Sequence, residues 1–554
     1  MIIRKTVAVL LAACLLFSIS GCKKHGPSNG DKQINYSLSG DPKTLDPQIA
    51  SDSDSVTVID ALYEGLARLD AKGAAQPGAA EKWESSADGT EFTFTLRKGA
   101  KWSDGTPVTA DDFVYAFRRA LDPNTGSAAC SPMFCIKNAR QVHSGRMKPE
   151  QLGVSATDSH TLTVRLEYSC PDFPVLTALP VFMPCNEKFF VSTSGRYGLE
   201  NKYVLGNGPF EIDGIYGWDH GKSLNLKRAD EYSGSVKPLP ANVDFDLTGK
   251  IFADQGAVPA TSEAADKNSA DLISALKSGA VDAAPVSSEE VDDAKAAGCT
   301  LESLQDATWG LCFNTRSSPM KNRKVRTAFL QAFSREKVLS HLSADTAAAD
   351  NILLPSTEFS GQDYLSLADG NSAYLRQDKS SAQTLAQGLS ELGLSEMESV
   401  TVLCPDDPNA KLMLNEMIIA WNTQFHNYFN MEALSETELK SRVRSGDYQL
   451  ALCPLTPDGP GPSGILSQFR SGAAGNPAGL KDTAYDTLLS KAETQSGKAG
   501  AQLYAQAEKY LNQQAVFYPI YYGRLYFALA KGVSGIVIHS FQGSIDFINA
   551  GKEQ

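Results

Sequence analysis

Residues 80–113 read AEKWESSADGTEFTFTLRKGAKWSDGTPVTADDF, a stretch that combines a strand, tight turns and the start of a helix. Within it, Phe92, Phe94 and Leu96 alternate with polar residues, which is the two-residue period of a strand with one buried face. Turn residues stand on both sides of this strand, at Asp88-Gly89 and at Asp104-Gly105-Thr106-Pro107. The stretch therefore predicts a compact β-turn-β-turn-helix unit.

The helix is predicted to begin just after Thr109. Threonine is a common N-cap residue, and Asp112 places an acid in the first turn, where it faces the positive end of the helix dipole. Apolar residues then recur at helical spacing: Phe113, Val114, Phe117, Ala120 and Leu121. These patterns predict local structure, and they indicate no function by themselves.

The same stretch resembles the signature of a large family of bacterial ABC-importer solute-binding proteins, the peptide- and nickel-binding family (extracellular family 5). The matching positions are Ala80-Glu81, Trp83, Asp88-Gly89, Phe92, Phe94, Leu96-Arg97, Lys101-Trp102, Asp104-Gly105, Pro107-Val108-Thr109-Ala110 and Asp112. Members of this family capture oligopeptides, dipeptides or nickel complexes outside the cytoplasmic membrane. The signature identifies the family, but it is scaffold and binds no ligand.

The resemblance implies an α/β fold of the two-lobe periplasmic-binding-protein type (class II), with an extra subdomain inserted in the first lobe. A chain of 554 residues exceeds one ordinary core, so several domains are expected in any case. The expected division is a signal peptide 1–21, a lipidated cysteine and tether 22–32, lobe I 33–69 with 199–312 and 519–554, the inserted subdomain 70–198, and lobe II 313–518. Two crossings between the lobes would form a hinge beside a ligand cleft.

The second lobe shows apolar strands that alternate with amphipathic helices, for example at 400–403, 412–425 and 436–443. Repeats of this length predict a parallel, doubly wound sheet. Residues 240–270 match the family poorly, because Asp, Ala and Ser stand where a strand pattern is expected, and we predict an irregular insertion there.

The N-terminus has the pattern of an export signal. Arg4 and Lys5 precede a short apolar run, too short for a stable membrane span. The run ends in Ile19-Ser20-Gly21-Cys22, which resembles a bacterial lipobox. The resemblance implies cleavage before Cys22 and acylation of that residue with several chains, including palmitate, which together anchor a protein firmly. The alternative is a signal that is cleaved without lipidation.

Ten cysteines are present, and eight remain after Cys14 leaves with the signal and Cys22 takes lipid. An even number in an exported protein suggests disulfides, although eight cysteines allow 105 pairings. Sequence neighbours and predicted strands suggest four pairs: Cys130–Cys135, Cys170–Cys185, Cys299–Cys312 and Cys404–Cys453. Eight reduced cysteines are the alternative. No metal site is expected, because CxxC is absent and the seven histidines are scattered.

Composition and motifs argue against a nucleic-acid-binding protein, a dinucleotide-binding protein and a serine enzyme. A net charge of −13 without a basic stripe argues against a nucleic-acid partner. The segment Gly459–Gly464 satisfies G-x-G-x-x-G, but its prolines remove backbone donors that a dinucleotide needs. The S-x-x-K pattern of penicillin-interactive serine enzymes occurs at Ser318 and Ser334, but the sequence contains neither of the Lys-Thr-Gly and Ser-Asp-Asn motifs that accompany it in those enzymes. We therefore expect neither an enzyme nor a cofactor.

Residues 455–466, LTPDGPGPSGIL, resemble the family loop in which an aspartate after a strand binds the α-ammonium of a peptide. Asp458 aligns with that acid when Pro462 and Leu466 are matched. The alternative is that Asp458 only forms a turn beside Gly459. The aromatic residues that flank this acid in the family are replaced here by Leu455 and Gly459, so the side-chain pocket is expected to differ. The resemblance adds three ligand contacts near the crossings: Asn314, Tyr521 and Tyr522.

The function that follows is capture of oligopeptides by a lipid-anchored monomer on the extracytoplasmic face of the cell membrane, and their delivery to ABC-transporter permease subunits. In-family alternatives are a dipeptide, a nickel chelate, haem or an oligosaccharide as the ligand. The alternative outside transport is a sensor lipoprotein with the same fold.

Overall fold

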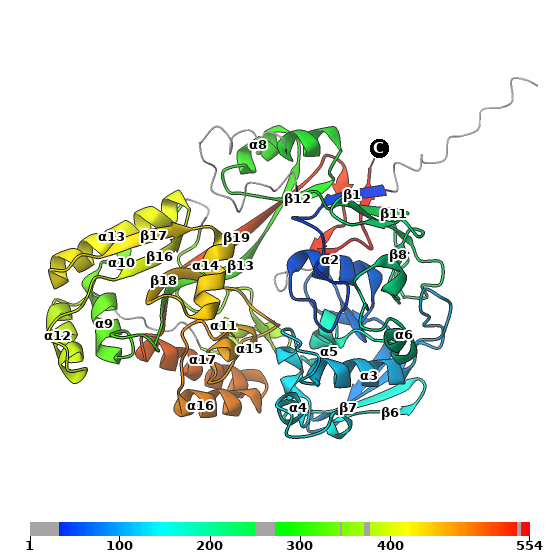
Figure 1. Ribbon diagram of the computed structural model, residues 1–554, viewed down its shortest axis with the longest axis horizontal. Helices are drawn as coiled ribbons and strands as arrows, with labels where there is room; N and C mark the ends of the chain where they lie inside the picture. Colours follow the sequence, from blue (N-terminus) through cyan, green and yellow to red (C-terminus); the bar gives the residue numbers. More distant parts are fainter. Residues whose placement is uncertain are drawn as a thin grey trace, which may run out of the picture.

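The computed structural model describes residues 33–249, 272–343, 346–369, 377–473, 475–539 and 545–553. These residues form two α/β lobes that lie side by side (Figure 1). The core of lobe I is built from residues between 34 and 294 and between 526 and 550. The core of lobe II is built from residues between 311 and 520, in two clusters on opposite sides of its sheet. No helix in these described ranges is long and apolar enough to cross a membrane.

One continuous sheet runs through both lobes. Its order is β17 (Asn430–Leu434), β16 (Thr401–Pro405), β18 (Leu450–Leu455), β13 (Thr300–Phe313), β19 (Phe517–Leu529), β12 (Ala283–Val286), β1 (Gln33–Ser37), β11 (Asn242–Asp246), β10 (Ser223–Arg228) and β8 (Phe210–Ile212), with β9 (Trp218–Asp219) beside β10. The two longest strands, β13 and β19, pair antiparallel from Thr300–Leu529 to Cys312–Phe517. These two strands carry the chain from lobe I into lobe II and back (Figure 1).

The signature stretch and the residues that follow it form a small domain with a four-stranded sheet of its own, packed on the core of lobe I. Strand β5 (Glu91–Leu96) buries Phe92, Phe94 and Leu96 and lies between β4 (Ala80–Ser85) and β7 (Thr161–Arg165), with β6 (Val154–Asp158) at the edge. Helix α3 (Ala110–Leu121) begins after Thr109, whose backbone N–H donates to Asp112 Oδ2 at 2.7 Å. The carboxylate thus caps the first turn, and the predicted strand and helix are both confirmed.

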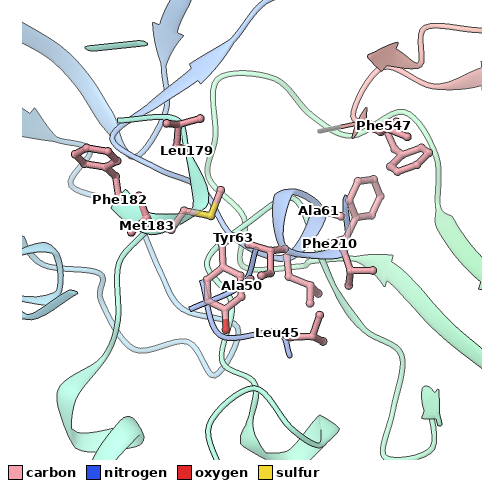
Figure 2. Close-up of a cluster of buried hydrophobic side chains, with 14 of the residues drawn as sticks. Leu45, Ala50, Ala61, Tyr63, Leu179, Phe182, Met183, Phe210 and Phe547 are labelled. Atoms are coloured by element: carbon pink, nitrogen blue, oxygen red, sulfur yellow. The ribbon is translucent and has the colours of Figure 1, made fainter. Parts of the chain in front are cut away.

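Buried side chains from distant parts of the sequence join this domain to the rest of lobe I (Figure 2). They come from residues 45–63, from 179–183, from β8 and from the C-terminal segment, and their labelled members are Leu45, Ala50, Ala61, Tyr63, Leu179, Phe182, Met183, Phe210 and Phe547. Helix α2 (Ser53–Leu62) lies among them. Burying a large apolar side chain contributes roughly 1.5–3 kcal/mol, so this shared cluster holds the domain firmly on lobe I.

Helices cover both faces of the sheet in lobe II. Helices α9 (Arg323–Ala332), α12 (Ser381–Glu391) and α13 (Pro408–Phe425) pack on one face, and α14 (Glu436–Ser445), α16 (Thr483–Glu493) and α17 (Gly497–Gln513) pack on the other. The predicted parallel sheet is only partly correct. Strand β16 is parallel to β17 and β18, whereas β13 is antiparallel to β18, because the chain enters and leaves the lobe on β13 and β19.

The predicted irregular insertion at 240–270 is wrong at its start. Residues 242–246 form β11, which pairs in parallel with β1 and buries Val243 and Phe245. Asp244 and Asp246, which alternate with these two residues, point to the other side of the strand, so the alternation was present in the sequence but hidden by its polar half. The remainder of that range, 250–271, lies outside the described residues.

The four predicted disulfides are also wrong in the structure, where all eight cysteines described are free thiols. Cys299 directly precedes β13 and Cys312 lies near the far end of that strand, about 40 Å away at roughly 3.3 Å per residue. Cys404 and Cys453 lie on neighbouring strands but on opposite faces of the sheet, in different core clusters. A one-residue difference in register produces this separation.

The two remaining pairs fail because each sulfur has a different neighbour. Cys130 lies 3.6 Å from His143 Nδ1, and Cys135 approaches the carbonyl oxygen of Pro132. Cys170 instead lies next to Cys135, and Cys185 is buried near Arg119. Burial raises the pKa of the Cys185 thiol to about 12, so this sulfur is an inert part of the core.

Candidate ligand cleft

A cavity of about 740 Å³ lies between the two lobes. Lobe I lines it with the segments 127–146 and 168–176, and lobe II lines it mainly with the segments 440–444 and 453–477. Its volume falls within the range of roughly 300–1,000 Å³ that is typical of small-ligand sites. The cavity is therefore suited to a compact ligand that contacts both lobes.

Two hydrogen bonds connect the lobes at this cavity. Ser131 Oγ of lobe I lies 3.5 Å from Asp458 Oδ2 of lobe II, and the backbone N–H of Ser360 in lobe II donates to Asp172 Oδ2 in lobe I at 3.3 Å. Burial raises the pKa of the Asp172 carboxyl. The structure thus has the lobes in contact around the cavity, while the connection between them remains the pair of strands β13 and β19.

The loop after β18 holds Asp458 in the cavity. The backbone N–H of Asp458 donates to the carbonyl oxygen of Gly464 at 3.0 Å, which closes the loop on itself. A Cβ atom at Gly464 would collide with the carbonyl oxygen of Gly459, and Gly461 has a φ of 70° that favours glycine. The glycines and prolines at 459–464 are therefore explained by this tight loop, and not by a nucleotide.

The Asp458 carboxyl has an unusual electrostatic environment. Burial between the lobes raises its pKa to about 7, although the hydrogen bond from Ser131 acts in the opposite direction. No lysine, arginine or histidine forms an ion pair with it within the described ranges 33–249, 272–343, 346–369, 377–473, 475–539 and 545–553. A carboxyl in this state can accept a cationic group from a ligand, because the pairing removes the cost of its desolvation.

The other three residues predicted to bind ligand lie outside the cavity lining. Asn314 is buried, and its side-chain amide donates to the carbonyl oxygens of Gly446 and Tyr448, so it fixes the start of lobe II. Tyr521 stacks on Trp309 across β13 and β19, with ring centroids 5.9 Å apart. Tyr522 is buried, and its hydroxyl accepts the backbone N–H of Asn351. All three stabilise the crossing strands or their neighbours.

The structure adds cavity residues that the sequence did not indicate. Ser131 belongs to a short 3-10 helix, η2 (Ser131–Cys135), and Arg140 belongs to α4 (Ala139–His143), both on the lobe I side of the cavity. Arg444, on α14, faces the cavity from lobe II. Only folding of the two lobes brings these residues near Asp458, so no local sequence pattern marks them. No group of three or more potential metal ligands occurs in the part of the chain that the structure describes.

Comparison with known proteins finds relatives that match almost the whole chain. Residues 74–477 match the bacterial extracellular solute-binding proteins, family 5 Middle. The chain is 27% identical to the oligopeptide-binding protein OppA of Bacillus subtilis, over 98% of this chain and 97% of that protein. It is 29% identical to the periplasmic murein peptide-binding protein MppA of Escherichia coli, over 95% of each chain. The fold matches that of Haemophilus influenzae OppA in complex with the peptide RPPGFSPFR with a TM-score of 0.76, at 22% identity, covering 95% of this chain and 99% of that one.

Proposed function

Because this chain belongs to the family 5 bacterial extracellular solute-binding proteins, a family of transport proteins and not of enzymes, we propose that it captures peptides in the cleft between its lobes and delivers them to an ABC transporter. Its two-lobe periplasmic-binding-protein fold suits this role, because a ligand that contacts both lobes favours their closed arrangement. The names of its relatives, which include oligopeptide- and dipeptide-binding proteins, support peptides as the ligand class.

Asp458 carries this proposal. Its carboxyl lies in the cavity without a cationic partner in the described part of the chain, and burial raises its pKa to about 7. The α-ammonium of a peptide supplies the missing positive charge at a fixed end of the ligand. Recognition of the amino terminus and of the main chain leaves the side chains free to vary, so one site accepts many sequences.

The proposal includes a membrane anchor at Cys22, which lies outside the described residues. Its support is the signal-like N-terminus ending in Ile19-Ser20-Gly21-Cys22. An anchor of several acyl chains keeps the binding protein beside its transporter on the extracytoplasmic face of the cell membrane. The protein acts there as a monomer that exchanges ligand with the permease subunits.

Titration calorimetry of Asp458→Asn tests the proposed ammonium contact. We expect the variant to bind peptides with a free amine more weakly by roughly 2–5 kcal/mol, the scale for breaking a buried charge pair. N-acetylated versions of the same peptides, which bind weakly to the wild type, should lose much less. Equal losses for the two peptide types, or no loss for either, would leave Asp458 as a turn residue and reopen the choice of ligand.

A further inference from the structure

Two cysteines of lobe I have their thiols in contact in the wall of the cavity. The side chain of Cys170 is hydrogen-bonded to that of Cys135, although the two residues lie far apart in the sequence. Both residues line the cavity, where Cys135 is buried and Cys170 keeps part of its surface exposed. A small reagent that enters the cavity therefore reaches the sulfur of Cys170 first, with the second thiol beside it.

The main chain holds the two cysteine segments side by side. Ile136 forms an isolated antiparallel bridge with Leu166, and the backbone N–H of Glu167 donates to the carbonyl oxygen of Cys135 at 2.8 Å. Cys170 follows three residues after Glu167. Both segments lie near α4, at the edge of lobe I that faces lobe II (Figure 1). The contact between the thiols is thus set by pairing of the backbone on either side.

The same two segments carry the lobe I groups that meet lobe II at the cavity. Ser131 belongs to η2, as Cys135 does, and its Oγ lies 3.5 Å from Asp458 Oδ2. Asp172 stands two residues after Cys170, and its Oδ2 accepts a backbone N–H of lobe II at 3.3 Å. A covalent bond between the two cysteines would therefore fix the spacing of the two groups through which lobe I contacts lobe II.

A second pair of thiols in contact, Cys312 and Cys453, is held too far apart at the backbone for a disulfide. In the ladder of β13 and β18, Cys312 faces Ala451 and Cys453 faces Gly310, so the two cysteines are diagonal neighbours. Diagonal Cα atoms of an antiparallel pair lie about 7–8 Å apart, whereas a disulfide usually spans about 4.4–6.8 Å. Cys170 instead lies in a loop, where no ladder imposes that distance. The pair in the ladder therefore serves as an internal control.

We propose that Cys135 and Cys170 form a reversible disulfide that cross-links the lobe I wall of the cavity and strengthens ligand binding. The structure shows the dithiol, and the oxidant is a small-molecule disulfide such as oxidised glutathione. The thiolate of Cys170 attacks one sulfur of the oxidant and expels a thiolate. The thiolate of Cys135 then attacks the Cys170 sulfur and expels the second. Two protons and two electrons thus pass from the cysteines to two small thiols.

The cross-link should strengthen binding because it removes conformational freedom that a ligand otherwise has to remove. With the two segments joined, Ser131 and Asp172 already have the spacing that the structure shows with the lobes in contact, so less order is gained on closure. We expect the affinity to rise by about three- to tenfold, the scale of ordering one or two side chains. This effect rests on the proposed function, whereas formation of the disulfide does not.

Peptide mapping by mass spectrometry tests the disulfide without any ligand. The material is the soluble form that begins after residue 22, made without its signal in the reducing cytoplasm so that all eight cysteines start as thiols. Contact with Cys135 and burial raise the pKa of the Cys170 thiol, so the exchange with oxidised glutathione is run at about pH 8.5. We expect a cross-link between Cys135 and Cys170 and none between Cys312 and Cys453.

Titration calorimetry with trialanine then measures the affinity of the reduced protein, of the oxidised protein and of the oxidised protein after dithiothreitol. The wild type should gain about three- to tenfold on oxidation and lose this gain on reduction. Cys135→Ala and Cys170→Ala should show no gain. Cys312→Ala is the matched control, because it removes a thiol of the other pair, outside the cavity lining, and should keep the full gain. Each variant is compared with itself before and after oxidation, so a change in its reduced affinity cancels.

The outcomes separate the disulfide from peptide capture. A map without the bond between Cys135 and Cys170, or with one between Cys312 and Cys453 in its place, would overturn the disulfide. A cross-link that leaves the affinity for trialanine unchanged, or lowers it, would support the bond and overturn its effect on binding. Failure of trialanine to bind either form would count against peptide capture and against that effect, while the map still decides on the bond. A reversible gain in the wild type and in Cys312→Ala, absent from Cys170→Ala, would support the whole proposal.

Discussion

The raised pKa of Asp458 makes peptide affinity depend on pH in a direction that can be worked out. In the free protein, burial raises the pKa of this carboxyl to about 7, so half of the molecules carry the carboxylate at pH 7. A bound ammonium favours the charged form and lowers the pKa again. Binding therefore requires the ionised carboxyl, and protons compete with the peptide below pH 7.

The size of the effect follows from the ionised fraction. At pH 5 only about one molecule in a hundred has Asp458 ionised, compared with one in two at pH 7, given a pKa of about 7. The affinity for a peptide with a free amine should fall by about 50-fold between these values, which is about 2.3 kcal/mol. The amine of a free peptide stays mostly protonated throughout this range, because its pKa is about 7.7–8.0.

Titration calorimetry from pH 5 to pH 7 measures this change in peptide affinity directly. Runs in two buffers of different ionisation enthalpy should also report net proton release on binding, close to one proton at pH 6. Asp458→Asn provides the control, since it removes this titration and leaves any contribution from Asp172, a carboxyl of the cavity wall whose pKa is also raised by burial. An affinity that is flat from pH 5 to pH 7, or a slope that is the same in Asp458→Asn, would refute the assigned role of Asp458.

Three further predictions concern the motion, the anchor and the cysteines. Because β13 and β19 are the strands that join the lobes, a calorimetrically verified ligand should lower the radius of gyration in small-angle scattering, and an unchanged value at saturation would contradict closure. Cys22→Ala should release the protein from membranes with peptide affinity unchanged; fractionation that still finds it on membranes would remove the lipid-anchor proposal. A soluble form that begins after residue 22 should give eight thiols with Ellman's reagent when denatured, and fewer would indicate disulfides.

The elements that local patterns control could be predicted from the sequence. The strand at Phe92–Leu96 and the cap formed by Thr109 and Asp112 depend on residues within a few positions of one another, so period and capping chemistry suffice. Strand β11 was missed although its register places Val243 and Phe245 in the core, because its acidic residues dominate the composition of the segment. A strand with one polar face can be recognised in a sequence only when the alternation of polar and apolar residues is examined before the overall composition of the segment.

The disulfide predictions failed for a related reason. The pair Cys404–Cys453 is predicted because each cysteine ends a strand of the same expected sheet, but the two lie on opposite faces of that sheet, and Cys312 shares its face with Cys453. Which face a sulfur occupies depends on strand register, and register depends on the pairing of β16, β18 and β13. Such pairing is a long-range property that the spacing of cysteines does not contain.

The cleft contains one residue that a local sequence pattern predicts and others that only folding of the two lobes brings to it. Asp458 could be predicted because its loop has a local pattern, the strand β18 followed by Pro, Gly and Ser residues that close it tightly. The lobe I residues across the cavity could not, because Ser131, Arg140 and Arg146 lie more than 300 residues earlier and reach the cavity only when lobe I meets lobe II. The residue proposed to bind the ammonium thus lies on lobe II, whereas Ser131, the side chain that contacts it across the cavity, lies on lobe I. A peptide whose ammonium binds Asp458 would then also contact lobe I, and the same contacts that choose the ligand would close the cleft around it.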